Sequence, residues 1–434
     1  MPTAAFTTLG CKVNQYETQK ILDSFAEKGF EIVPFEGPAD VYVVNSCSVT
    51  SDAERKSRYT IRRAKRFNND AKVVVTGCAA QMSLNRGEAV DSADLLVPNP
   101  EKLNSWQYFA AEFPELVPPP QPELRTTGIQ GRTRATLKVQ DGCNVMCSYC
   151  SIPYTRPGMV SRPAVEVLRE AQKLAESGYH EAILTGVLIG AYDEASGSGG
   201  PDFNQLVKLL AEESGLARLR ISSIEVHQVT PELIRLAQEG LIAPHFHIPL
   251  QSGDSGVLKD MNRRYDQDTY IELCQRLKSE IPDVTLTTDI MVGFPTETRE
   301  RFESSLHVCE AVGFHSAHVF TFSPRWGAPA DAWGDPVSPE EKSARRLELV
   351  KITAETGRAH VAKFVGRTMR VLVEGKIAKD GMLQGLTDNY LTVKYCGPAT
   401  HCRTLQQVKL VEASGMEIFG ELAGDTSTAL RVLA

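Results

Sequence analysis

Three cysteines stand close together in the segment Asp141–Cys150. Cys143, Cys147 and Cys150 follow the spacing C-x3-C-x2-C. Three thiolates on one short loop can bind three irons of a 4Fe–4S cluster, and one iron then stays open to another ligand because no fourth cysteine is near. A structural zinc loop is the alternative, although zinc usually takes four protein ligands in a closed site. The spacing therefore favours an open-sided iron–sulfur cluster.

Three further cysteines are far apart in the sequence but share one context. Cys11, Cys47 and Cys78 each follow a short apolar stretch that predicts a parallel strand. The carboxyl ends of parallel strands meet at one edge of a sheet, where α/β proteins bind ligands. The three thiols could therefore converge and carry a second cluster with one free iron. Three separate buried cysteines are the alternative.

The composition limits the class of protein. The chain has 434 residues, a net charge of −7, 42% hydrophobic residues and ten cysteines. These values are typical of a globular protein of about three domains, and exclude disordered, collagen-like and membrane-embedded classes. No apolar run approaches the ~18 residues of a membrane span, and the first residues do not resemble a signal peptide. We therefore expect a cytoplasmic protein whose thiols stay reduced.

The elements that must position the cysteines can be read from the apolar pattern. Residues 1–113 alternate short strands with helices, which predicts an open parallel α/β sheet. The strands are expected near residues 5–9, 41–44, 73–75 and 95–97, and the helices near residues 18–28, 52–67 and 102–113. A proline-rich linker is then expected over residues 114–130, because prolines are excluded from helix interiors and central strands. Its prolines are Pro114, Pro118, Pro119, Pro120 and Pro122.

The rest of the chain predicts two more domains. Residues 131–362 repeat a strand–helix unit six times, which predicts a partial (β/α)6 barrel with its site at the carboxyl ends of the strands. The strands are expected over residues 135–139, 182–185, 219–223, 245–250, 284–292 and 317–322. Residues 363–434 alternate with period two and predict a small antiparallel β-barrel.

Eight stretches of the sequence resemble the radical SAM (S-adenosylmethionine) methylthiotransferase family. These are Thr8–Glu17, Asn45–Thr50, Gly77–Gln81, Gln140–Cys143, His247–Gly253, Met261–Tyr265, Asp289–Pro295 and Phe320–Arg325. The resemblance spans nearly the whole chain. Gly10–Glu17 is similar to the branch of the family that acts on N6-threonylcarbamoyladenosine in tRNA, whereas Arg156–Arg162 departs from the usual Arg-Gly stretch.

The resemblance implies a fold, cofactors and partners. It implies a methylthiotransferase domain in residues 1–113, a radical SAM barrel in residues 131–362 and an RNA-binding TRAM domain in residues 363–434. Cys11, Cys47 and Cys78 would hold an auxiliary 4Fe–4S cluster, and Cys143, Cys147 and Cys150 would hold the cluster that cleaves SAM.

Two SAM molecules would serve methylthiolation of C2 of the modified adenosine 3′ of the anticodon. A low-potential electron donor of the flavodoxin or ferredoxin type and a sulfur donor would be partners, and no membrane would be involved. The same chemistry on isopentenyladenosine or on a ribosomal-protein aspartate is an alternative, as is an iron–sulfur RNA-binding protein without catalysis.

Polar residues at the predicted barrel strand ends are candidates for contacts with SAM. They are Gln251, Ser252, Glu225 and Asp289. Hydrogen bonds that merely hold loops are the alternative. Arg263 could bind a carboxylate or phosphate, or form a surface ion pair. We expect His245 and His247, in one predicted strand, to face opposite sides.

Two stretches could bind RNA. The predicted helix at residues 52–67 has a basic stripe that could follow phosphates, although a solvated helix face is the alternative. Its candidate residues are Arg55, Arg58, Arg62, Arg63 and Arg66. The terminal barrel adds Arg367 and Lys376, with Tyr390 and Tyr395 expected to be available for stacking on bases.

Overall fold

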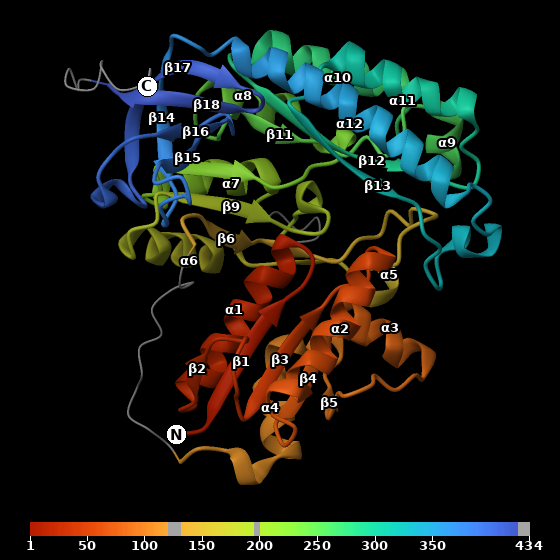
Figure 1. Ribbon diagram of the computed structural model, residues 1–434, viewed down its shortest axis with the longest axis vertical. Coiled ribbons are helices and arrows are strands. Elements are labelled where there is room, and N and C mark those ends of the chain that lie inside the picture. The colour runs from red at the N-terminus through yellow and green to blue at the C-terminus, as the bar shows by residue number, and fades with distance from the viewer. Residues whose placement is uncertain (120–131, 195–199, 424–434) are drawn as a thin grey trace. The chain divides into compact units, whose positions relative to one another are not determined.

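The computed structural model describes residues 1–119, 132–194 and 200–423 (Figure 1). The backbone forms two compact units. The first unit contains Met1–Ile129, Gln140–Val160 and Ser323–Trp333, and the second contains Gln130–Val139, Ser161–Phe322 and Gly334–Ala434. Both three-cysteine sets therefore belong to the first unit. The part of the predicted linker over residues 120–130, with Pro120 and Pro122, lies outside the described residues.

The first unit is built on a five-stranded sheet in the order β2-β1-β3-β4-β5, in which every neighbouring pair is parallel. The strands are β1 (Thr3–Thr8), β2 (Glu31–Val33), β3 (Val41–Ser46), β4 (Lys72–Gly77) and β5 (Leu95–Leu96). The predicted open parallel sheet is confirmed. The sequence analysis missed β2, which is only three residues long.

Helices cover both faces of this sheet, drawn red to orange in Figure 1. Val41 and Val43 of β3 pack in one apolar cluster, with residues of α1 and α4. Tyr42 and Val44 pack in a second cluster, with residues of α2 and α3. A strand covered on both faces is typically a continuous apolar run, as Val41–Val44 of β3 are. The helices are α1 (Lys12–Glu27), α2 (Ser51–Phe67), α3 (Cys78–Arg86), η1 (Asn99–Asn104), α4 (Ser105–Glu112) and η2 (Pro114–Leu116).

Two further segments complete the first unit. Residues 140–160 carry β7 (Gln140–Asp141), α5 (Ile152–Thr155) and the first residue of β8 (Val160–Ser161), and residues 323–333 carry η5 (Pro329–Trp333). Ala330 N donates to Ser148 O at 2.7 Å, which joins these two segments.

Before the terminal barrel, the described part of the second unit has six strands that are parallel to their paired neighbours and follow one another in sequence order. Strands β6, β9 and β10 form one sheet, and β11, β12 and β13 form another. Backbone hydrogen bonds from Ala243 N to Leu219 O and from Ile224 N to His247 O join the two sheets. The strands are β6 (Ala135–Lys138), β9 (Glu181–Thr185), β10 (Arg218–Ile221), β11 (His245–His247), β12 (Thr285–Val292) and β13 (Ser316–Thr321).

Helices alternate with these strands, as the repeated pattern predicts, and their apolar faces share one core with the strands. Cys274 and Cys309 are buried in this core. The elements are α6 (Ala164–Glu176), η3 (Ile189–Ala191), α7 (Phe203–Glu213), η4 (Val226–Gln228), α8 (Pro231–Gln238), α9 (Ser255–Asp260), α10 (Gln267–Glu280), α11 (Arg299–Val312) and α12 (Pro339–Ala362). Within the described part of the chain, no helix is long and apolar enough to cross a membrane.

The chain ends in a closed β-barrel with the strand order β14-β15-β16-β18-β17. The predicted small barrel is confirmed, but one pair, β16 with β18, is parallel because β17 lies between them in the sequence. The strands are β14 (Thr368–Val373), β15 (Leu383–Thr387), β16 (Thr392–Tyr395), β17 (Leu405–Ser414) and β18 (Glu417–Leu422), with η6 (Ala399–His401) before β17.

Candidate functional site

The structure brings Cys11, Cys47 and Cys78 to one edge of the first sheet. Cys11 is the N-cap of α1 after β1, Cys47 follows β3, and Cys78 is the first residue of α3 after β4. Strands β1, β3 and β4 are neighbours in the sheet. Their carboxyl ends therefore present the three cysteines on the same side, as the parallel topology predicts.

The three thiols are close enough to affect one another. A Cβ atom on Gly10, where φ is +94°, would lie only 2.6 Å from Cys47 Sγ, so the chain entering α1 packs directly against that thiol. Burial raises the pKa of the Cys47 thiol to about 11, and the neighbouring Cys78 and Cys11 thiols also raise it. Three thiolates at such a place repel one another unless a cation lies between them.

The chemistry of this set fits an iron–sulfur cluster. Cys47 and Cys78 are buried while Cys11 is exposed, so the set has one open side. Cys11 and Cys78 begin helices, whose N-terminal dipoles favour anionic thiolates. Within the described residues, no three His, Cys, Asp or Glu side chains converge as one metal ion would require. A 4Fe–4S cluster does not require its ligands to converge on one metal ion, because each cysteine binds a different iron.

Cys143, Cys147 and Cys150 lie on one loop of the first unit, after β7. Backbone N–H groups point at two of the sulfurs: Val145 N lies 3.5 Å from Cys143 Sγ, and Ile152 N lies 3.4 Å from Cys150 Sγ. Hydrogen bonds to sulfur are one of the means by which a protein tunes a cluster. The loop therefore also fits an iron–sulfur cluster.

Buried charged residues lie next to the cysteines in the structure. The sequence analysis did not select these charged residues as site candidates. Glu17, Lys102 and Arg156 form an ion cluster in the first unit. Arg325 contacts Ser48 O at 3.3 Å, one residue after Cys47. Glu17 could have been noticed because it ends the stretch Thr8–Glu17, which resembles the family. No sequence signal identifies Lys102, because its burial depends on packing.

The candidate SAM residues lie in the second unit. Gln251 adopts φ +64°, and its buried Oε1 has no hydrogen-bond partner among the described residues. A buried polar oxygen without a partner is costly unless a ligand supplies one. Ser252 is fully buried, and its hydroxyl accepts a hydrogen bond from Asp254 N at 3.2 Å. Ser252 therefore has a loop-holding role in addition to any contact with SAM.

Asp289 contacts two histidines, His247 Nε2 at 3.1 Å and His318 Nδ1 at 3.5 Å. Burial raises the pKa of the Asp289 carboxyl group, but the hydrogen bonds from these histidines outweigh burial and hold that pKa well below its ordinary value. The carboxylate is therefore ionised throughout the neutral range.

The expectation that His245 and His247 face opposite sides was wrong. Residues two apart in a strand share a face, and both rings contact Thr287 Oγ1 at 3.0 Å.

Glu225 and Arg263 form an ion pair with each other. The Arg263 side chain is only 3% exposed, and its guanidinium lies over the Tyr265 ring, 5.1 Å from the centroid. The arginine side of the pair is therefore buried, while the Glu225 side chain is 19% exposed. Each residue already has one charged partner, which limits what either can offer to a ligand.

The basic stripe of α2 divides into paired and unpaired cations. Arg55, Arg58 and Arg63 form ion pairs with Asp52, Glu54 and Glu36, respectively. Arg62 and Arg66 are exposed, and neither forms an ion pair within the described part of the chain. Their charges are thus available to a polyanion.

Tyr59 adds an aromatic side chain to the middle of the same stripe. It is 53% exposed and lies four residues after Arg55 and three before Arg62. Exposed aromatic rings among cations are suited to stacking on nucleic-acid bases.

The terminal barrel offers less than the sequence analysis expected. The expectation that Tyr390 and Tyr395 are available for stacking was wrong: Tyr395 is fully buried, and Tyr390 already stacks on His245 with ring centroids 4.1 Å apart. Arg367 is exposed but forms an ion pair with Asp283. Lys376 is exposed.

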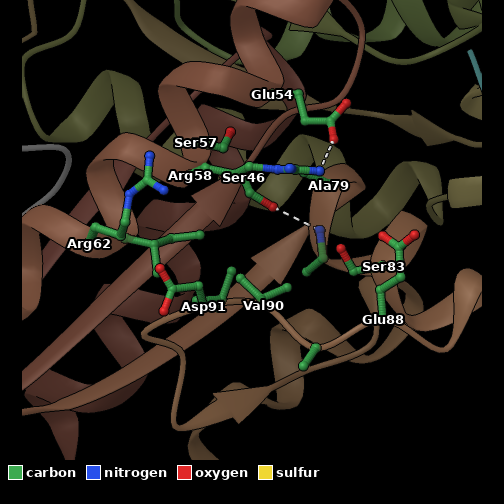
Figure 2. Close-up of a pocket in the computed structure, with 14 residues that line it drawn as sticks. Ser46, Glu54, Ser57, Arg58, Arg62, Ala79, Ser83, Glu88, Val90 and Asp91 are labelled. Atoms are coloured by element: carbon green, nitrogen blue, oxygen red, sulfur yellow. Dashed lines mark hydrogen bonds and ion pairs between the residues drawn. The ribbon is translucent and has the colours of Figure 1, made fainter.

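A pocket of about 420 Å³ lies between α2 and α3, as Figure 2 shows. Arg58 and Arg62 of α2 line it opposite Ser83 of α3 and the acidic side chains Glu88 and Asp91. None of the six cysteines lines it. The pocket also reaches the cysteine edge, because Ser46 and Ala79, the neighbours of Cys47 and Cys78, line it.

Comparison with protein-family models gives two matches. Residues 3–97 match the model described as Uncharacterized protein family UPF0004, and residues 137–309 match the Radical SAM superfamily. The first match contains Cys11, Cys47 and Cys78, and the second contains the C-x3-C-x2-C loop.

Curated relatives match nearly the whole chain. A Bacillus subtilis protein named threonylcarbamoyladenosine tRNA methylthiotransferase MtaB is 37% identical over 95% of this chain and 94% of its own length. A Thermotoga maritima protein of the same name is 34% identical, with 92% of each chain covered. A Thermodesulfovibrio yellowstonii protein named tRNA-2-methylthio-N(6)-dimethylallyladenosine synthase is 31% identical, with 89% of this chain and 91% of its own length covered.

Among solved structures, the fold is similar to that of TsrM, a radical S-adenosylmethionine methyltransferase from Kitasatospora setae solved with cobalamin and a 4Fe–4S cluster bound. The TM-score is 0.54 at 15% identity, covering 76% of this chain and 77% of that chain. At this identity the likeness concerns the fold alone.

Proposed function

This chain belongs to the radical SAM methylthiotransferase family, and we propose that it methylthiolates C2 of N6-threonylcarbamoyladenosine, 3′ of the anticodon in tRNA. The observation that carries the substrate assignment is that relatives with this substrate in their names match up to 95% of this chain, at up to 37% identity. The relative named for dimethylallyladenosine is less similar, at 31% identity.

Membership of the family implies SAM and a 4Fe–4S cluster, for which Cys143, Cys147 and Cys150 are the candidate ligands. We infer a second cluster on Cys11, Cys47 and Cys78. Their position at one sheet edge, the buried thiols and the helix N-termini support it.

Bound there, the clusters and two SAM molecules would supply the methylated sulfur and the radical chemistry that breaks an aromatic C–H bond, which no side chain can do. A low-potential electron donor and a sulfur donor would be needed as partners. The protein's own groups bind and orient. The unpartnered Gln251 Oε1 would accept a hydrogen bond from SAM, and the ionised Asp289 would hold the His247 ring in place.

We propose that tRNA binds along α2. Arg62 and Arg66 supply charges without an ion-pair partner among the described residues, and Tyr59 lies between the cations. Phosphates bind such cations, and this binding is favoured by the release of counterions. Unstacked loop bases can stack on an exposed ring. The paired Arg55, Arg58 and Arg63 would contribute less, because their charges are partly neutralised.

Replacing Arg62 and Arg66 together with glutamate should weaken tRNA binding, because two phosphate contacts become repulsive. The affinity should also depend less steeply on salt. The slope of log K against the logarithm of the salt concentration should shrink by the contribution of about two phosphate contacts. Filter binding at several salt concentrations measures both effects. Arg169→Glu with Lys173→Glu is the matched control, since these exposed cations have the same four-residue spacing on α6 in the second unit. Equal losses in both double variants would contradict a role for α2.

Nucleoside mass spectrometry of tRNA tests the substrate directly. A strain lacking the gene should accumulate N6-threonylcarbamoyladenosine without its methylthio form, and the plasmid-borne chain should restore that form. If the methylthio form persists where no second such enzyme exists, the assignment fails. Loss of methylthio-isopentenyladenosine, or of a methylthio-aspartate in a ribosomal protein, would instead support the alternative substrates. Unchanged modifications throughout would support a non-catalytic RNA-binding protein.

A further inference from the structure

Arg156 is a buried arginine in the first unit, six residues after Cys150. Its side chain is 3% exposed. Its Nη1 donates to Glu17 Oε1 at 3.0 Å and to Asp141 Oδ1 at 2.7 Å, and its Nη2 donates to Glu17 Oε2 at 2.8 Å and to Asn14 Oδ1 at 2.7 Å. Such two-point contacts with a carboxylate fix both position and orientation.

A second buried cation lies on the same carboxylate. Lys102 Nζ is 2.5 Å from Glu17 Oε2, and the two side chains are 2% and 1% exposed. Burial lowers the pKa of Lys102, and Glu17 opposes that change. Glu17 thus lies between two cations, Lys102 and Arg156.

Two of the partners of Arg156 belong to an element next to the auxiliary cysteines, whereas Asp141 belongs to β7. Asn14 and Glu17 lie on α1, three and six residues after Cys11. The Asn14 amide group also donates to Leu9 O at 2.9 Å and to Ser46 O at 3.0 Å, the residues next to Gly10 and Cys47.

The segment before Arg156 is attached to Cys78 and its helix. Asn99 Nδ2 donates to Thr155 O at 2.6 Å and lies 3.8 Å from Cys78 Sγ. Asn85 of α3 donates to Tyr154 O at 2.9 Å. The segment that follows the radical SAM cysteines is therefore hydrogen-bonded to the elements that carry Cys11 and Cys78.

The charge of this cluster calls for a reason beyond stability. Replacing a buried ion pair by well-packed apolar residues is often neutral or stabilising. In the low-dielectric interior, however, a buried cation acts strongly on nearby charges. Arg156 interacts electrostatically with Cys47 and Cys78, and Lys102 interacts with Cys78.

We propose that Arg156 is a positioning residue that holds the segment after Cys150 against the auxiliary cysteines, and that its charge and that of Lys102 stabilise the reduced auxiliary cluster. The inference rests on the proposed function, because it takes Cys11, Cys47 and Cys78 to hold that cluster. Reduction adds one negative charge to a cluster. A nearby cation therefore raises the reduction potential, and a nearby carboxylate lowers it.

The test compares the reduction potentials of three variants with that of the full-length chain, reconstituted anaerobically and titrated with electron paramagnetic resonance as the readout. Arg156→Gln should shift the auxiliary potential to more negative values. At a pH at which Lys102 stays protonated, Glu17→Gln should shift it to more positive values, and Arg156→Lys should keep most of the original potential. A general loosening of the fold does not produce opposite shifts from two partners of one ion pair.

Arg345→Gln is the matched control, because it breaks an equally buried pair, with Glu297, in the second unit. It should leave the auxiliary potential unchanged. No shift in Arg156→Gln, or shifts of the same sign in Arg156→Gln and Glu17→Gln, would overturn the inference. If Arg156→Gln does not fold, Glu17→Gln provides the test. The absence of a positive shift in its auxiliary reduction potential would also overturn the inference.

Iron content separates this inference from the proposed function. If the wild-type chain binds about four irons instead of about eight, it has no auxiliary cluster. The proposed two-cluster function and the proposed role of Arg156 would then both be wrong. About eight irons with unshifted potentials would overturn only the role of Arg156. Shifted potentials in a chain that modifies a different nucleoside would leave the role of Arg156 intact.

Discussion

Cys47→Ala should reduce the iron content from about eight to about four per chain, yet leave reductive cleavage of SAM intact. The remaining irons would belong to the cluster on the C-x3-C-x2-C loop, whose cysteines are contributed by a different segment of the first unit. The methylthio product should be lost completely, because the proposed auxiliary cluster would be the site of the sulfur. Iron assays measure the iron content, and chromatography of 5′-deoxyadenosine measures reductive cleavage of SAM.

Cys147→Ala should give the reciprocal result. About four irons should again remain, but 5′-deoxyadenosine should no longer form, because the iron proposed to bind SAM would be lost with this cluster. Cys396→Ala is the control, since Cys396 is an exposed cysteine outside both sets. If Cys47→Ala and Cys147→Ala lose the same activity, the division of labour between the two sets is incorrect.

Glu181→Gln should lower the free energy of unfolding by about 3–5 kcal/mol, the cost of leaving buried charges without their partner. Glu181 is fully buried between Arg218, whose Nε is 2.6 Å away, and Arg220, whose Nε is 2.8 Å away. Both arginine side chains are 2% exposed. Denaturant unfolding followed by circular dichroism gives the free energy.

The effect should extend to the terminal barrel, because the same arginines hold it. Arg218 Nη1 donates to Asp388 at 2.6 Å, and the Arg220 guanidinium lies 5.0 Å from the centre of the Tyr390 ring. Loss of Glu181 should therefore make the β15–β16 turn more accessible to proteases. Glu239→Gln is the control, since it breaks an exposed pair with Arg235 and should cause no measurable loss.

The pH dependence gives an independent check on Glu181. Burial raises the pKa of its carboxyl group, but Arg220 and Arg218 outweigh burial and hold that pKa below its ordinary value. The stabilisation is therefore complete above the pKa of an unfolded glutamate, about 4.3, and is lost as the pH falls below it. Glu181→Gln should lack this part of the acid dependence, and an unchanged pH profile would contradict the assignment.

The sequence by itself determined the two cysteine sets and the kind of fold that carries them. The C-x3-C-x2-C spacing is local, so Cys143, Cys147 and Cys150 could be recognised without any tertiary information. Cys11, Cys47 and Cys78 could be grouped because parallel strands align their ends by topology alone. The period-two pattern of residues 363–434 likewise predicted the closed barrel.

Tertiary structure decided which charged and aromatic groups surround these features. Glu17, Lys102 and Arg156 are up to 139 residues apart, and they meet only because the segment after Cys150 packs on α1 and η1. Tyr390 was expected to face RNA, but it stacks on His245 of the partial barrel. Local patterns record periodicity and spacing, whereas the partner of a buried charge or ring depends on side chains that are distant in sequence. The electrostatics around the auxiliary cysteines could therefore be found only in the folded chain.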